Sequence, residues 1–118
     1  MRMKKVTIWH NPRCSKSRET LTLLQSRHME IEVIEYLITP PQATEIEHAL
    51  ALLRMQPRGL MRRNESDYRV HHLDDTQLTH TQLIEAMHLY PILIQRPVVF
   101  ANGKACIGRP PELVLRIL

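Results

Sequence analysis

Glycine, cysteine and aromatic residues are scarce in this chain of 118 residues, which has three glycines, two cysteines and 4% aromatic residues. So few aromatic rings leave few platforms on which nucleic-acid bases could stack. No apolar stretch approaches the roughly 20 residues of a membrane span, so we expect no membrane association. No run of five like charges occurs, and repeats and low-complexity segments are absent. The chain is therefore expected to be a single globular domain spanning residues 1–118.

The charge balance favours anionic partners. Lysine and arginine number 16 against 12 aspartates and glutamates, which gives a net charge of +4. Nucleic acid, a membrane surface and small oxyanions are all anionic, and charge alone does not choose among them. Because the basic residues are spread along the chain, we expect no nucleic acid. The N-terminus Met1–Lys5 is followed by an apolar run of only strand length, so no secretory signal is expected. These features predict a cytoplasmic protein whose two cysteines are free thiols.

Hydrophobic periodicity predicts a β-α-β unit at the start of the chain. Lys5–Trp9 is mostly apolar and is expected to be a buried strand. Ser15–Ser26 places leucines at helical spacing. Ile31–Leu37 begins with alternating apolar and acidic residues, so it is expected to be a second strand, parallel to the first because a helix connects them.

The middle of the chain is predicted to be helical, and the end returns to strands. Thr39 is expected to cap the first of the middle helices. Asn102-Gly103 is the signal for a type I′ turn between two strands. The expected segments are a helix over Gln42–Arg54, a helical turn over Leu60–Arg63, an irregular stretch over Asn64–Thr76, a helix over Thr79–Leu89, strands over Pro97–Phe100 and Lys104–Ile107, and a short helix over Glu112–Leu118.

This order of elements predicts an α/β (α+β) fold. A parallel pair, an antiparallel hairpin and flanking helices form a four-stranded mixed sheet of thioredoxin or glutaredoxin type. The helical insertion between the second and third strands covers about residues 40–92. This architecture would bring Cys14 beside Arg96 and Pro97, and a cis peptide bond before Pro97 is expected.

A cysteine stands where the first helix is predicted to begin. The preceding strand ends in the turn Asn11-Pro12, and Cys14 follows. The first amides of a helix have no intrahelical partners and carry positive partial charge, so they stabilise a thiolate and an oxyanion beside it. Arg13, Lys16 and Arg18 add positive charge. We therefore expect Cys14 to be a nucleophilic thiolate with a lowered pKa. The competing interpretation is an inert apolar filler.

The segment His10–Leu21 resembles the nucleophile loop of the glutaredoxin-coupled arsenate reductases, including the pattern His-x3-Cys-x3-Arg. The likeness runs the length of the chain. Leu60–Asn64 resembles that family's arginine-bearing helix, Gln95–Val99 its arginine before a cis-proline, and Gly108–Pro110 its final arginine.

The resemblance implies that arsenate, or a similar small oxyanion, is reduced through an adduct on Cys14. Glutathione as co-substrate and glutaredoxin as partner would resolve the adduct, with no bound cofactor and no metal. His10 is the implied histidine beside the nucleophile. Guanidinium forks suit a tetrahedral anion. The implied substrate contacts are Arg62, Arg96, Arg109, Ser15, Ser17 and Arg18.

Several alternatives remain open. His10 could orient the loop by hydrogen bonding instead of transferring protons, and Cys106 could be a buried filler or a resolving thiol. A glutathione-linked thiol transferase of the same fold is one rival function, although it needs no cluster of arginines. A regulator that binds RNA polymerase is another, although such proteins carry a Cys-x-x-Cys motif, which this loop lacks. His71 and His72 lie in a polar segment and are expected to be solvated, not metal-binding.

Overall fold

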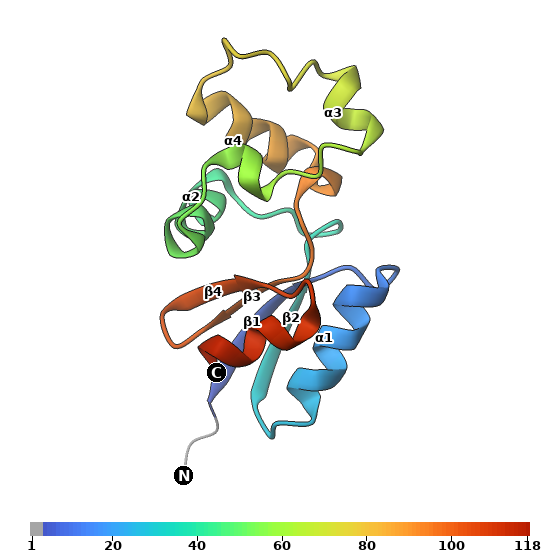
Figure 1. The fold of residues 1–118 in the computed structure, drawn as a ribbon, viewed down its shortest axis with the longest axis vertical. Helices are drawn as coiled ribbons and strands as arrows, with labels where there is room; N and C mark the ends of the chain where they lie inside the picture. The colour runs from blue at the N-terminus through green and yellow to red at the C-terminus, as the bar shows by residue number, and fades with distance from the viewer. Residues whose placement is uncertain (1–3) are drawn as a thin grey trace. The chain divides into compact units, whose positions relative to one another are not determined.

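The computed structural model describes residues 4–118. The expected absence of a secretory signal depends in part on Met1–Met3, which lie outside the described residues. The chain divides into two compact units (Figure 1). Residues Met1–Thr39 and Arg96–Leu118 form the first, here called the sheet unit, and Pro40–Gln95 forms the second, the helical unit. The insertion that the sequence placed at about 40–92 thus extends to residue 95. Its description as part of a single domain stays a prediction.

The sheet unit is built on four strands in the order β2-β1-β3-β4. Strand β1 (Lys5–His10) runs parallel to β2 (Glu30–Glu35) and antiparallel to β3 (Val98–Ala101). Strand β3 in turn pairs antiparallel with β4 (Lys104–Ile107). The predicted α/β class and four-stranded mixed sheet are confirmed. Strand β4 has the predicted bounds, and the ends of the other strands differ from the predicted ones by at most two residues.

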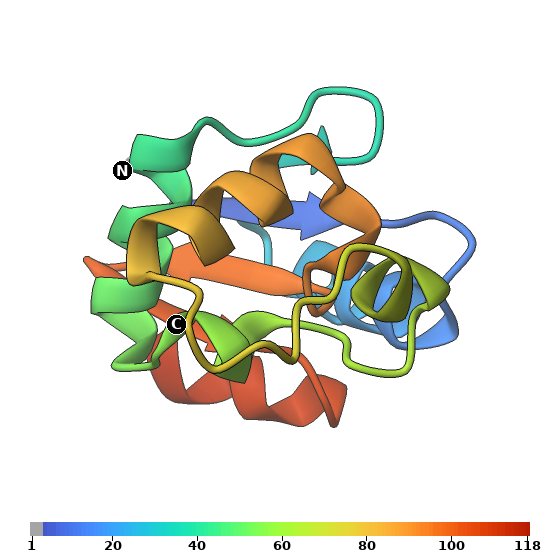
Figure 2. The same ribbon diagram turned by 90° about the horizontal axis from the view of Figure 1, so that it is seen from above.

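One face of this sheet is covered by α1 (Ser15–Gln25) and the 3-10 helix η3 (Pro111–Ile117), which lie side by side in Figures 1 and 2. Leu24 of α1 is fully buried in the core between them. Burying such a side chain contributes about 1.5–3 kcal/mol. The other buried members of this core are Val6, Ile8, Val99, Ala101, Val114 and Ile117.

The hairpin between β3 and β4 has the predicted turn. Asn102 and Gly103 have φ values of 53° and 71°, and a type I′ turn requires positive φ at both central residues. The Asn102 side-chain amide donates to the carbonyl of Ile117 at 2.9 Å, so the turn is also fastened to η3.

The helical unit packs α2 (Ala43–Leu53) against α4 (His80–Leu89) (Figure 2). Apolar residues at helical spacing put Ile46 and Leu50 of α2, and Leu83 and Met87 of α4, in the interior. The shorter segments are η1 (Pro57–Leu60), α3 (Ser66–Val70) and η2 (Pro91–Leu93). No helix among residues 4–118 combines the length and apolar character needed to cross a bilayer.

Two helix starts differ in how well the sequence predicted them. Thr39 was the expected cap of α2, but Gln42 takes that position. The Glu45 side chain accepts the Gln42 amide at 2.9 Å, as in a capping box. Thr79, the first residue of the predicted second long helix, is instead the N-cap of α4, where its hydroxyl accepts the Gln82 amide at 3.1 Å.

Two predictions for the segment between α2 and α4 were wrong. The helical turn expected over Leu60–Arg63 lies earlier, at Pro57–Leu60, because proline presets φ for the first helical position. Met61 then forms a β-bridge with Ile94, so the residues after it are not helical. The stretch expected to be irregular contains α3, which buries Tyr68 to 7% exposure.

Candidate active site

Cys14 is the N-cap residue of α1, as the sequence predicted. Its backbone is extended, with φ −95° and ψ 123°, and its carbonyl accepts the Arg18 amide at 3.0 Å. The Cys14 amide donates to the Asn11 carbonyl at 3.0 Å, and the Asn11 side-chain oxygen accepts the Arg13 amide at 3.0 Å. These local hydrogen bonds fix the turn, so the thiol is held at the open end of the helix.

The pKa of the Cys14 thiol lies below its ordinary value. Burial acts to raise it, but hydrogen bonds from the backbone amides of Ser17 and Lys16 and from the Arg96 side chain outweigh that effect. The positive charge of Arg96 lowers the pKa further. Because the thiolate is the nucleophilic form, the site favours a reactive Cys14.

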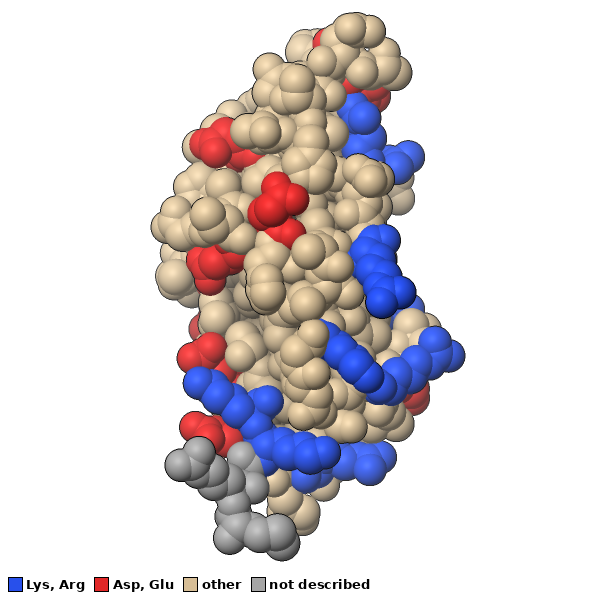
Figure 3. Space-filling view, turned by 90° about the vertical axis from the view of Figure 1, so that its left-hand side faces the viewer, with Lys and Arg blue, Asp and Glu red and all other residues tan. Residues whose placement is uncertain are grey.

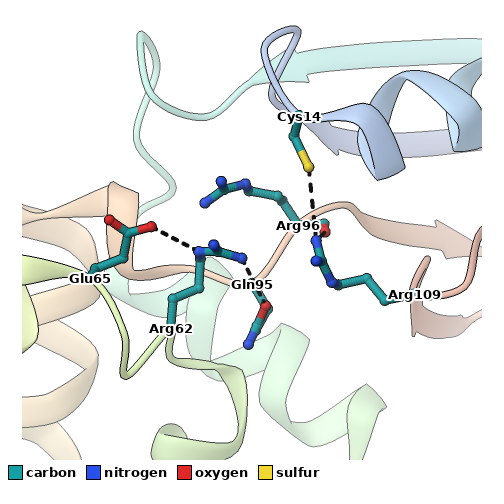
Figure 4. A network of polar contacts seen from close by, with 6 residues as sticks. All are labelled: Cys14, Arg62, Glu65, Gln95, Arg96 and Arg109. Atoms are coloured by element: carbon teal, nitrogen blue, oxygen red, sulfur yellow. Dashed lines mark hydrogen bonds and ion pairs between the residues drawn. The ribbon is translucent and has the colours of Figure 1, made fainter.

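Arg109 contacts the same sulfur. Its Nη1 atom donates to Cys14 Sγ at 3.8 Å and to the Arg96 carbonyl at 3.1 Å (Figure 4). Within the sheet unit, two arginines distant from Cys14 in the sequence therefore act on its thiol: Arg109 through the 3.8 Å contact, and Arg96 through the effect of its side chain on the thiol pKa. The peptide bonds before Pro97 and Pro110 are both cis, and only the first was predicted from the sequence.

Gly108, the residue before Arg109, lies close to α1 and Pro97, and no role for it was predicted from the sequence. Its amide donates to the Pro97 carbonyl at 3.0 Å. A Cβ atom at residue 108 would lie 2.6 Å from Thr20 Oγ1 and 2.9 Å from Pro97 Cγ. Only glycine therefore lets the chain after β4 pass this close to α1 and Pro97. The signal available in the sequence was a glycine directly before an arginine of the site.

His10 is hydrogen-bonded to the loop that carries Cys14. Its Nδ1 lies 2.6 Å from the Ser17 hydroxyl, and that hydroxyl also accepts the Asn11 amide at 3.0 Å. His10 is 6% exposed and Ser17 is fully buried. Burial lowers the pKa of His10; Glu35 opposes this effect and Arg18 adds to it. A neutral imidazole can accept the Ser17 hydroxyl hydrogen, so the geometry suits an orienting role for His10.

The predicted substrate contacts within the loop have different surroundings. Ser15 is exposed as the first residue of α1. The Ser17 hydroxyl is hydrogen-bonded to His10 and to the Asn11 amide, whereas the backbone amide of Ser17 hydrogen-bonds the Cys14 sulfur. The Arg18 guanidinium donates to the Pro12 carbonyl at 3.0 Å. The substrate roles of these three residues stay predictions.

Arg62 belongs to the helical unit. Its Nε lies 3.0 Å from Glu65 Oε1, and its Nη1 donates to Gln95 Oε1 at 3.4 Å (Figure 4). Gln95 directly precedes Arg96 in the chain. The predicted role of Arg62 as a further oxyanion ligand stays a prediction.

The second cysteine lies in a different environment. Cys106 is on β4, opposite Val99 of β3, and packs against the core. Burial raises the pKa of its thiol. Neither cysteine is in a disulfide.

In the part of the chain that the structure describes, no three His, Cys, Asp or Glu side chains are grouped so that they could hold a metal ion. On the face drawn in Figure 3, basic and acidic side chains both occur.

The site thus combines a strand, a turn, a cysteine at a helix start, and one arginine on each side of a hairpin. A family model matches nearly the whole chain. The ArsC family model covers residues 9–117. The chain belongs to the ArsC family. This finding confirms the resemblance that the motifs indicated.

ArsC relatives match this chain from end to end. Over 117 residues it is 42% identical to an arsenate reductase of Neisseria meningitidis, with 98% of this chain and all of that protein covered. It is 52% identical over 116 residues to the uncharacterized protein YfgD of Escherichia coli K12, with 98% of each covered. The solved structure of an arsenate reductase from Vibrio cholerae superposes with a TM-score of 0.96 at 45% identity, covering 98% of this chain and 99% of that one. The thioredoxin-like architecture is thereby confirmed.

Proposed function

We propose that this ArsC protein reduces arsenate to arsenite through an adduct on Cys14. The observation that carries the proposal is the environment of the sulfur. Backbone amides and Arg96 lower the pKa of the thiol, and Arg109 lies 3.8 Å from Sγ. A thiol transferase needs the lowered pKa but has no use for two guanidinium groups at one sulfur. An enzyme that attacks a tetrahedral oxyanion needs both the lowered thiol pKa and the guanidinium groups, which bind the oxygens.

In the first proposed step, the Cys14 thiolate attacks arsenic. An S–As bond forms, and one arsenate oxygen takes up protons and leaves as water, while arsenic stays at the +5 level. Arg96 and Arg109 neutralise the charge on the remaining oxygens, which is electrostatic stabilisation joined to nucleophilic catalysis. We propose Arg62 as a third ligand of the oxyanion, on the strength of the family resemblance.

In the second stage, two electrons must reach arsenic from two thiols. We propose that glutathione and glutaredoxin supply them and leave as a mixed disulfide, so that arsenite is released and Cys14 regains its thiolate. Cys106 is a poor candidate for either thiol, because burial raises its pKa and it packs against the core. We propose the cytoplasm as the compartment, since there glutathione keeps thiols reduced.

The test is arsenate-dependent NADPH consumption with purified protein, glutathione, glutaredoxin and glutathione reductase. Cys14→Ser should abolish turnover, and Cys106→Ser, as the matched control, should retain it. If the unmodified protein gives no turnover while Cys14 still reacts with iodoacetamide, arsenate is the wrong substrate. The thiol transferase then becomes the leading function.

A further inference from the structure

We propose that Arg13 binds a carboxylate of glutathione when glutathione attacks the Cys14 adduct. This inference rests on the proposed arsenate reduction and identifies the residue that selects its small thiol co-substrate.

The cations around the nucleophile differ in how they are already used. The segment Asn11–Arg18 contains three cations and no aspartate or glutamate. The Arg18 guanidinium is bound to the Pro12 carbonyl, and Lys16 Nζ lies 3.6 Å from Glu19. Arg13 is exposed, and within residues 4–118 it forms a hydrogen bond only through its backbone amide. Its guanidinium therefore keeps all its donors for a ligand.

The backbone under Arg13 is held in place. The Arg13 amide donates to the Asn11 side chain, and the next amide, that of Cys14, donates to the Asn11 carbonyl, both at 3.0 Å. The Cα atoms of Arg13 and Cys14 are about 3.8 Å apart, as in any trans peptide. Ligand binding thus needs to order only the Arg13 side chain, which limits the entropy cost.

Glutathione has the matching chemistry. Its cysteinyl residue is followed directly by a glycyl carboxylate, and one extended residue spans at most about 3.6 Å. In the proposed step, the glutathione thiolate forms a second S–As bond and displaces another oxygen, which leaves as water. At that moment Arg96 and Arg109 are engaged by the oxyanion. A separate guanidinium beside Cys14 is then needed to hold the carboxylate.

The first experiment measures KM for glutathione with saturating arsenate and glutaredoxin. Arg13→Ala should raise it about threefold to fivefold, as for an exposed ion pair, and should leave KM for arsenate and glutaredoxin unchanged. Arg27→Ala, an exposed arginine beyond the far end of α1, is the matched control and should change none of them. With the unmodified protein, glutathione esterified at its glycyl carboxylate should show the same raised KM that glutathione shows with the Arg13→Ala variant. A rise in KM for glutaredoxin instead would assign Arg13 to a protein surface and overturn the inference.

A second experiment needs no arsenate, so it separates failure of this inference from failure of the proposed function. The Cys14 thiolate attacks glutathione disulfide to form a protein–glutathione disulfide and release glutathione thiolate, and the rate is followed by mass spectrometry. Arg13→Ala should slow this reaction threefold to fivefold and leave the reaction with neutral bis(2-hydroxyethyl) disulfide unchanged. Selective slowing without any arsenate turnover would refute the reductase and keep Arg13 as the carboxylate site. Equal slowing of both disulfides would place the effect on the thiolate itself and overturn the inference.

Discussion

Replacing Gly108 by alanine tests whether the close approach of the chain after β4 to α1 requires a glycine at the residue before Arg109. The added Cβ would lie 2.6 Å from Thr20 Oγ1 and 2.9 Å from Pro97 Cγ, so at least one of these groups must move. Thr20 is fully buried, and its hydroxyl donates to the Lys16 carbonyl at 2.8 Å. Its displacement would cost about 1 kcal/mol for that hydrogen bond alone. With the strain of overpacking, we expect a loss of about 1–3 kcal/mol in the free energy of unfolding.

Chemical denaturation measures this loss, and Gly59→Ala is the matched control. A Cβ at Gly59 meets nothing closer than Met55 Cβ at 3.4 Å, an ordinary contact. Its substitution should be neutral or stabilise the protein by up to about 1 kcal/mol. Because Thr20→Ala removes the closest clash, the double variant with Gly108→Ala should be more stable than the sum of the single effects predicts, by at least about 0.5 kcal/mol. Additive effects, or a Gly108→Ala protein as stable as the original, would refute the reasoning.

Three further predictions concern the thiolate, the buried histidine and the hairpin. Arg96→Ala should shift the pH profile of Cys14 alkylation by iodoacetamide to higher pH, since it removes a hydrogen bond and a positive charge that lower the thiol pKa; an unmoved profile would contradict this. His10 has a folded-state pKa below its ordinary value of 6.5, so the unfolded state binds more protons and stability should fall as pH drops below about 6.5. Urea titrations of the protein and of His10→Asn should show that the variant loses part of this slope, and equal slopes would rule His10 out as its source. Gly103→Ala should cost about 1 kcal/mol, because φ at this position is 71° and the open space around it leaves backbone strain as the only cause; thermal unfolding checks it, and an unchanged midpoint would count against the strain.

The elements that the sequence predicted correctly depend on local information. The parallel pair β1 and β2 follows from a mostly apolar segment and an alternating apolar and acidic segment joined by one helix, and the register sets Val6 beside Ile31 and Ile8 beside Val33. The hairpin follows from Asn102-Gly103 alone. Cys14 at the start of α1 was predictable for the same reason, because a turn dipeptide and a helix start are adjacent in the sequence.

The features that the sequence did not reveal depend on contacts between distant residues. The Arg58 guanidinium donates to the carbonyls of Leu73 and Asp75. These hydrogen bonds hold in place part of the segment Asn64–Thr76, which was expected to be irregular because its residues are mostly polar. The role of Gly108 requires Thr20 and Pro97 to be near it, which no local pattern indicates. The neutral state of His10 is favoured by burial, and the hydrogen bond of its ring to the Ser17 hydroxyl joins residues seven positions apart, so neither follows from the residues next to it in the sequence.

The backbone and side-chain hydrogen-bond donors around Cys14 indicate how one site could stabilise first the thiolate and then a bound oxyanion. The thiolate is stabilised by the backbone amides of Ser17 and Lys16, which belong to the first turn of α1, and by the Arg96 side chain. Arg109 uses Nη1 for the sulfur and for the Arg96 carbonyl, and within residues 4–118 its Nε and Nη2 make no hydrogen bond. In the reaction proposed above, attack on arsenic would remove the negative charge from the sulfur and leave it on the oxygens. The Arg109 guanidinium would then shift its donors from sulfur to oxygen without moving its backbone, so the contact that favours the thiolate before attack would favour the proposed adduct after it.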